Sequence, residues 1–209
     1  MFLTTPHSFA LVNLKPLLPG HVLVCPLEPH KRLTDLSAPE LTDLFQAVQR
    51  VQRMLARHYF TSATAADATI AAAAVSPGAA DAPAAGTPEA GSFNIAVQDG
   101  VGAGQTVPHV HVHVIPRIAG ETAKDPRTAG DAVYEEMAAE GGNVGGALWD
   151  RELGRRPAPG GAFDRIEDAA RGARSMDEMV AEADLFRGVL AAMARDEMAE
   201  ERRSEEASS

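Results

Sequence analysis

The chain has 209 residues, 45% of them hydrophobic and 23% charged, which is enough for one ordinary globular domain with added segments. The formal net charge of -10 argues against a surface for nucleic acid or anionic membrane, because such surfaces need clustered lysine and arginine. A single cysteine, Cys25, excludes an internal disulfide framework, and we expect it to be a buried, inert thiol.

The first part of the chain predicts two strands and a helix. Short apolar runs at 9–14 and 21–27 are typical of strands, and the proline and glycine residues between them mark a turn. Ser37 and Glu40 have the spacing of a capping box, so a helix is expected to begin at Ser37. Apolar residues that recur every three or four positions predict one buried stripe on this helix, made of Leu41, Leu44, Phe45, Val48, Val51 and Leu55.

Residues 61–91 are rich in alanine, proline and glycine and have too little apolar bulk for a core, so we expect a mobile insertion. Residues 93–98 then predict another strand. It is followed by a glycine-rich turn, Gly100 to Gly104, and by Gln105 and Thr106. Glycines let backbone N–H groups approach an anion, and the amide and the hydroxyl can donate to phosphate or to a departing oxygen. The alternative is a flexible hairpin loop without a ligand.

Between Pro108 and Pro116 three histidines alternate with branched apolar residues, in the order His109, Val110, His111, Val112, His113, Val114, Ile115. In a strand this alternation places the imidazoles on one face and the valines on the other. Residues four apart are separated by roughly 13 Å, whereas zinc needs each nitrogen at about 2.0–2.1 Å, so at most a pair could chelate one ion. Neutral imidazole is a nucleophile for phosphorus, and the row therefore favours phosphoryl or nucleotidyl transfer.

The C-terminal part predicts a second insertion and a last helix. Residues 138–174 are rich in glycine, alanine and arginine, like the first insertion in kind. Ser175 and Glu178 again have capping-box spacing. The helix that follows has one apolar side, formed by Met179, Val180, Ala183, Phe186, Leu190 and Met193. We expect a single domain over residues 1–200, a frayed end from Glu200 to Ser209, and a charged tail at 201–209. The order strand, strand, helix, strand, strand predicts an α+β fold with a helix packed on an antiparallel sheet.

The string from Gln98 to Arg117, QDGVGAGQTVPHVHVHVIPR, resembles the histidine-triad superfamily and within it the fragile-histidine-triad branch of dinucleoside polyphosphate hydrolases. Further similar segments lie at 8–16, 19–27, 43–45, 133–136 and 174–179. The resemblance covers 1–60 and 92–137 well and the last helix more loosely. It implies an antiparallel sheet of about five strands with one long packed helix and a C-terminal helix.

The resemblance also implies a role for each matching residue. His111 matches the nucleophile that attacks the α-phosphorus, and His113 matches a donor to a phosphate oxygen. His109 and His21 match residues that support the site from behind, and Gln105 matches the residue near the departing bridging oxygen. The other implied substrate contacts are Asn13, Gln98, Gly104, Thr106 and Val107.

The implied reaction is cleavage of P1-P3-bis(5'-adenosyl) triphosphate to AMP and ADP through a nucleotidyl-histidine intermediate. No tightly bound cofactor and no metal on the protein are expected, although Mg²⁺ or Mn²⁺ would accompany the substrate. Two alternatives stay open, a nucleoside phosphoramidate hydrolase and a nucleotide-binding signalling module with slow turnover. We expect a homodimer in the cytoplasm, with the nucleus as a second compartment, and no nucleic-acid or membrane partner. The resemblance implies further residues before Phe2, so either the chain begins upstream or adenine binding is weakened.

Overall fold

A five-stranded antiparallel sheet, in the order β1-β2-β3-β5-β4, is the centre of the molecule. The computed structural model describes residues 1–61, 83–119, 121–123 and 173–208. The strands are β1 (Leu3–Thr4), β2 (Ser8–Val12), β3 (Val22–Pro26), β4 (Ser92–Ala96) and β5 (Val112–Arg117). This arrangement confirms the predicted fold class. None of the helices in the described ranges is both long and apolar enough to cross a membrane.

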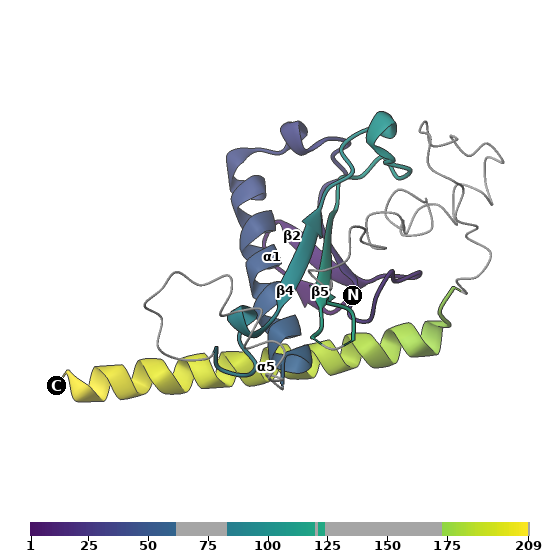
Figure 1. Cartoon of the computed structure of the whole chain (residues 1–209). Helices are drawn as coiled ribbons and strands as arrows, with labels where there is room; N and C mark the ends of the chain where they lie inside the picture. Colours follow the sequence, from purple (N-terminus) through teal and green to yellow (C-terminus); the bar gives the residue numbers. More distant parts are fainter. Residues whose placement is uncertain (62–82, 120, 124–172, 209) are drawn as a thin grey trace, which may run out of the picture.

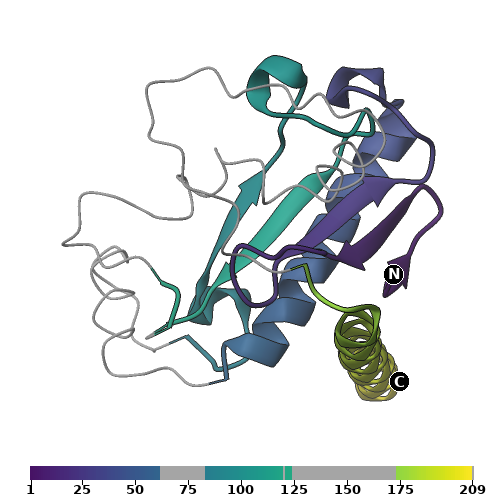
Figure 2. The same ribbon diagram turned by 90° about the vertical axis from the view of Figure 1, so that its right-hand side faces the viewer.

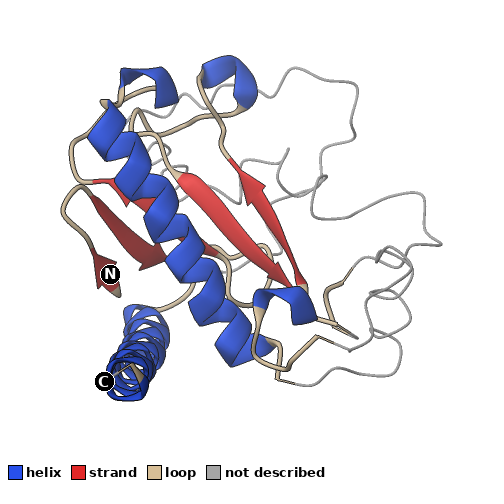
Figure 3. Ribbon diagram, turned by 90° about the vertical axis from the view of Figure 1, so that its left-hand side faces the viewer, coloured by secondary structure: helices blue, strands red, loops and turns tan. Residues whose placement is uncertain are grey.

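Helix α1 (Ala38–Tyr59) lies across one face of the sheet (Figure 3). The predicted capping box is confirmed, because the Glu40 carboxylate accepts the Ser37 N–H at 2.9 Å and the Ser37 hydroxyl at 2.6 Å. The side of α1 that faces the sheet consists of Leu44, Ala47, Val48, Val51, Met54 and Leu55, all buried.

Two members of the predicted stripe on α1 are wrong. Leu41 and Phe45 are 39% and 40% exposed. At 3.6 residues per turn both fall on one flank of the helix, whereas the buried Ala47 and Met54 fall on the other. Periodicity therefore located the apolar side of α1 but placed its centre too far toward Phe45.

Helix α5 (Met176–Ala207) begins as predicted, since the Ser175 hydroxyl accepts from the Glu178 N–H at 3.2 Å and Glu178 accepts from the Ser175 N–H at 2.7 Å. Its buried side consists of Ala183, Phe186, Leu190 and Met193. Phe186 meets Phe2 edge to face with ring centroids 5.2 Å apart, and Figure 2 looks along α5 where it lies beside the N-terminal strands.

Two predictions for this helix are wrong. Val180 is 48% exposed, because the first turns of α5 place only Met179 partly against the core. The charged end does not fray at Glu200 but stays helical to Ala207, where it extends past the sheet (Figure 1). Arg57 of α1 forms an ion pair with Asp196 at 2.6 Å, which ties this half of α5 to the body.

The end of the predicted insertion 61–91 is an ordered turn. The Gly86 N–H donates to the Phe60 carbonyl at 2.8 Å, and a short 3-10 helix, η2 (Pro88–Ala90), follows. Residues 62–82 and 124–172, which carry the rest of the first predicted insertion and nearly all of the second, lie outside the described residues. Two more 3-10 helices, η1 (Leu33–Asp35) and η3 (Val101–Ala103), lie before α1 and in the glycine-rich turn.

Candidate active site

The histidine segment leads into β5 rather than lying wholly within it. β5 begins at Val112, so the prediction that His109 and His111 are strand residues is wrong. In the segment before β5, the Val110 N–H donates to the His30 carbonyl at 2.7 Å, and this bond holds the segment in place of strand pairing. The alternation itself persists, because Val112 and Val114 are fully buried in the core beneath α1. The histidines that alternate with them belong to the other face of the sheet.

His111 and His113 lie side by side. Their ring centroids are 5.0 Å apart, and they are 5% and 2% exposed. Within the described part of the chain, neither ring's Nε2 atom has a hydrogen-bond partner, although both atoms are buried. Buried polar atoms are ordinarily paired, so two neighbouring exceptions indicate a place where a ligand is bound.

Backbone groups determine which nitrogen of each ring carries the proton. His111 Nδ1 lies 2.9 Å from the His109 carbonyl, which can only accept, so Nδ1 is protonated and Nε2 holds a lone pair. The Leu17 N–H donates to His21 Nδ1 at 3.1 Å, which leaves the proton of His21 on Nε2. That Nε2 lies 3.0 Å from His113 Nδ1 and donates to it, so His113 is protonated on Nε2.

Burial keeps both rings neutral. Burial, with a smaller contribution from the neighbouring His111, lowers the pKa of His113 to about 3. Burial also lowers the pKa of His111, against an opposing contribution from its hydrogen bond to His109. At neutral pH the site therefore presents a bare nucleophilic nitrogen next to an N–H donor, without a charge on either ring.

His109 and His21 surround this pair in different ways. His109 donates from Nε2 to the Pro26 carbonyl at 2.9 Å and so joins the histidine segment to the end of β3. His21 is fully buried behind His113, with ring centroids 5.2 Å apart. The supporting roles predicted for both residues stay predictions.

Gln105 closes the glycine-rich turn. Its amide oxygen accepts the Gly100 N–H at 2.9 Å, and its amide nitrogen donates to the Lys31 carbonyl at 2.8 Å. An amide nitrogen has two N–H groups, so the second can still donate to a ligand. The turn is also held by the ion pair of Arg32 with Asp99 at 3.0 Å.

The remaining predicted contact residues lie in or near this turn, except Asn13, which lies beside His21. Thr106 is buried, and its hydroxyl has no partner among the described residues. Val107 and Gly104 are half-buried, and a Cβ on Gly104 would lie 3.0 Å from the Gln98 amide nitrogen. Asn13 is fully buried beside His21, with its amide nitrogen 3.3 Å from His21 Nε2. The predicted contacts of these residues with substrate stay predictions.

Several groups that shape the site have no signature in the sequence. The site uses the backbone carbonyls of Pro26, Lys31 and His109 and the backbone N–H of Leu17. Every residue type offers such a carbonyl, and every type except proline offers such an N–H. Only the side chains that they orient could be recognised beforehand.

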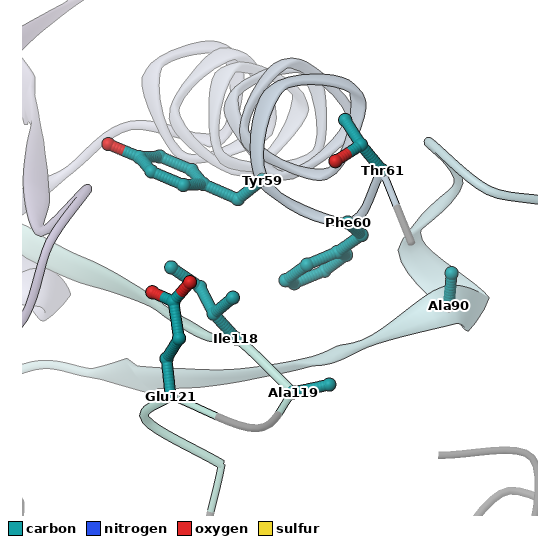
Figure 4. Close-up of a pocket in the computed structure, with 7 residues that line it drawn as sticks. All are labelled: Tyr59, Phe60, Thr61, Ala90, Ile118, Ala119 and Glu121. Atoms are coloured by element: carbon teal, nitrogen blue, oxygen red, sulfur yellow. The ribbon is translucent and has the colours of Figure 1, made fainter. Parts of the chain in front are cut away.

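One pocket in the described part of the chain lies away from the histidines. It has a volume of about 200 Å³ and lies beyond the far end of β5 (Figure 4). It is lined by Tyr59, Phe60, Thr61, Ala90, Ile118, Ala119 and Glu121. Burial raises the pKa of Tyr59 to about 12, so the phenol is neutral there. None of the lining residues is a histidine, and we place the active site at the imidazoles instead. In the described ranges, no group of three or more His, Cys, Asp or Glu side chains could hold a metal ion.

Residues 1–120 match the model of the HIT domain. The chain belongs to the HIT-domain family. Among its HIT-domain relatives, the asymmetrical bis(5'-nucleosyl)-tetraphosphatase of Schizosaccharomyces pombe is 36% identical over 192 residues, which are 90% of this chain and 87% of the relative. The bis(5'-adenosyl)-triphosphatase of Dictyostelium discoideum is 37% identical over 140 residues, covering 67% of this chain and 71% of the relative. The crystal structure of the Caenorhabditis elegans NitFhit protein matches 90% of this chain with a TM-score of 0.50 and 30% identity, although the match spans 26% of that protein.

Proposed function

We propose that this chain hydrolyses dinucleoside polyphosphates through a covalent nucleotidyl intermediate on His111. One observation carries the proposal: the ring of His111, with a lone pair on Nε2, lies 5.0 Å from the ring of His113, which is protonated on Nε2. Both Nε2 atoms are buried and have no hydrogen-bond partner among the described residues. The hydrolases named among the relatives support the same class of substrate.

The first step exchanges one bond for another. His111 Nε2 attacks the α-phosphorus, a P–N bond forms, and the P–O bond to the departing nucleotide breaks. The His113 N–H donates to a non-bridging oxygen, where negative charge accumulates. The proton of His111 stays on Nδ1 and donates to the His109 carbonyl, and this hydrogen bond stabilises the positive charge of the substituted ring.

The second step returns the ring to its starting state. Water attacks the same phosphorus, the P–N bond breaks, and the nucleoside monophosphate leaves. The electron pair returns to His111 Nε2, and the proton of the water passes to solvent. We propose that diadenosine triphosphate is the preferred substrate. Its cleavage gives AMP and ADP.

The face of the sheet that carries the histidines also has apolar side chains, against which the nucleobase of a substrate could pack. Phe9 pairs with Cys25, Leu11 pairs with Leu23, and Leu23 pairs with His113, so these side chains share one face. Phe9 and Leu11 are half-buried, which leaves part of each side chain accessible to a ligand.

We propose that a divalent cation arrives on the phosphates of the substrate, and a chelator should then slow turnover without changing the stability of the free protein.

We also propose a homodimer. Among the described residues, β4 is paired on one side only, by β5, and Ile95 in it is 39% exposed. An open strand edge with an apolar side chain is a surface that a second copy can cover. Light scattering on the purified chain should give twice the monomer mass, and a monomer at micromolar concentration would contradict this.

The intermediate can be tested by rapid quenching with diadenosine triphosphate, followed by mass spectrometry. We expect an AMP adduct on the peptide that contains His111, and none in His111→Asn. His7→Asn, at an exposed histidine, is the matched control and should retain the adduct. An adduct on another residue would refute the assignment, and a panel with diadenosine tetraphosphate and adenosine phosphoramidate would rank the substrates.

A further inference from the structure

The proton position on His113 depends on the turn of backbone from Asn13 to Gly20. The Leu17 N–H in this turn donates to His21 Nδ1 at 3.1 Å, and His21 Nε2 lies 3.0 Å from His113 Nδ1. Without the Leu17 N–H, a neutral His21 can carry its proton on either nitrogen. His113 would then no longer be held with its own proton on Nε2.

Two elements hold this turn from outside. On one side, a Cβ on Gly20 would lie 2.5 Å from the Tyr59 ring, so the end of α1 packs directly on the turn. On the other side stands Arg174, two residues before α5 begins. Its Nε and Nη2 donate to the Asn13 carbonyl at 3.1 and 2.5 Å, and its backbone N–H donates to the Leu14 carbonyl at 3.0 Å.

The Arg174 side chain is itself fixed. Its Nη1 donates to Glu182 Oε2 at 2.7 Å, and the side chains of the two residues are only 19% and 18% exposed. A planar guanidinium with three engaged nitrogens holds its acceptors in one direction. The next link is Asn13, whose backbone N–H donates to the His21 carbonyl at 3.3 Å.

We propose that Arg174 is a positioning residue for His113. By holding the carbonyls of Asn13 and Leu14, it keeps the Leu17 N–H on His21 and thereby keeps the proton of His113 on Nε2. Arg174 acts through the turn and through His21, not on the substrate. The use of that proton in turnover rests on the proposed function, but its position on the ring does not.

The test compares Arg174→Met with Arg187→Met in the full chain. Arg187 lies within α5 and, like Arg174, donates to a backbone carbonyl, that of Met1 at 2.8 Å, so it is a matched control away from the turn. Long-range proton–nitrogen NMR spectra, recorded without substrate, distinguish a protonated ring nitrogen from a bare one. The same samples are used to measure kcat and KM for diadenosine triphosphate.

In Arg174→Met we expect the Nε2 signal of His113 to shift toward an average of two tautomers. We expect kcat to fall by about 10- to 100-fold and KM to change less, because the displaced donor serves the transition state. Arg187→Met should keep the ring-nitrogen signals and kcat of the wild type. Arg174→Lys keeps the positive charge but loses the planar set of donors, so it should show the same changes more weakly. It takes the place of Arg174→Met in the test if Arg174→Met does not fold.

Wild-type ring-nitrogen signals in a folded Arg174 variant would overturn the proposal, and so would the same change in Arg187→Met. A chain that cleaves no dinucleoside polyphosphate would instead overturn the proposed function. The spectra would still decide the role of Arg174 in that case, because they need no substrate.

Discussion

Replacement of His113 by asparagine should change how stability depends on pH. The asparagine amide oxygen can accept the His21 N–H in place of His113 Nδ1, so no buried donor is left without an acceptor. Asparagine does not titrate, whereas His113 has a pKa of about 3 in the folded protein. Its unfolded value is about 6.5.

The sign follows from proton binding. Between pH 6.5 and 3 the unfolded wild-type chain holds a proton at His113 that the folded chain does not, so acid favours unfolding. The contribution of neutral His113 is fully present above pH 6.5 and is lost by up to about 1.4 kcal/mol per pH unit below it. From pH 6 to pH 4.5 the wild type should therefore lose about 2 kcal/mol more than His113→Asn.

Urea unfolding followed by circular dichroism at the two pH values measures this difference. Carboxylates and other histidines titrate in both proteins, so their contributions cancel in the comparison. His7→Asn is the control for removal of an exposed imidazole and should follow the wild type. Equal losses in the wild type and in His113→Asn would refute the reasoning that burial keeps His113 neutral.

Three further predictions use other parts of the structure. Leu44→Ala should lower the free energy of unfolding by about 2–5 kcal/mol and Leu41→Ala by less than about 1 kcal/mol, and the reverse order in urea unfolding would contradict the assigned buried side of α1. Gly20→Ala should lower the free energy of unfolding by more than about 1 kcal/mol, because Gly20 has a φ of 75° and faces the Tyr59 ring. Gly102→Ala should leave it nearly unchanged in the same assay, because nothing lies within 4 Å of a Cβ at that position. Gln105→Ala should lower kcat/KM by about 10- to 100-fold with little change in Tm, because it removes the acceptor of the Gly100 N–H and so opens the turn. An unchanged kcat/KM in steady-state assays would argue against a role for this turn.

Local patterns in the sequence predicted most of the elements. Ser37 with Glu40 and Ser175 with Glu178 marked both helix starts, because a capping box lies within four residues of chain. Apolar periodicity is less decisive, and it misplaced Leu41, Phe45 and Val180, since the exact buried flank depends on where a helix rests on its neighbours.

The sequence by itself determined which side chains carry the chemistry. Three histidines that alternate with valines belong together whatever the fold, and the alternation puts the valines in the core and leaves the imidazoles for a ligand. The tertiary structure alone decided how these rings can act. The Leu17 N–H and the carbonyls of His109 and Pro26 select the protonated nitrogens, and burial removes the charge. Such backbone groups are alike at almost every position, so only folding, which brings distant segments together, gives them a specific role.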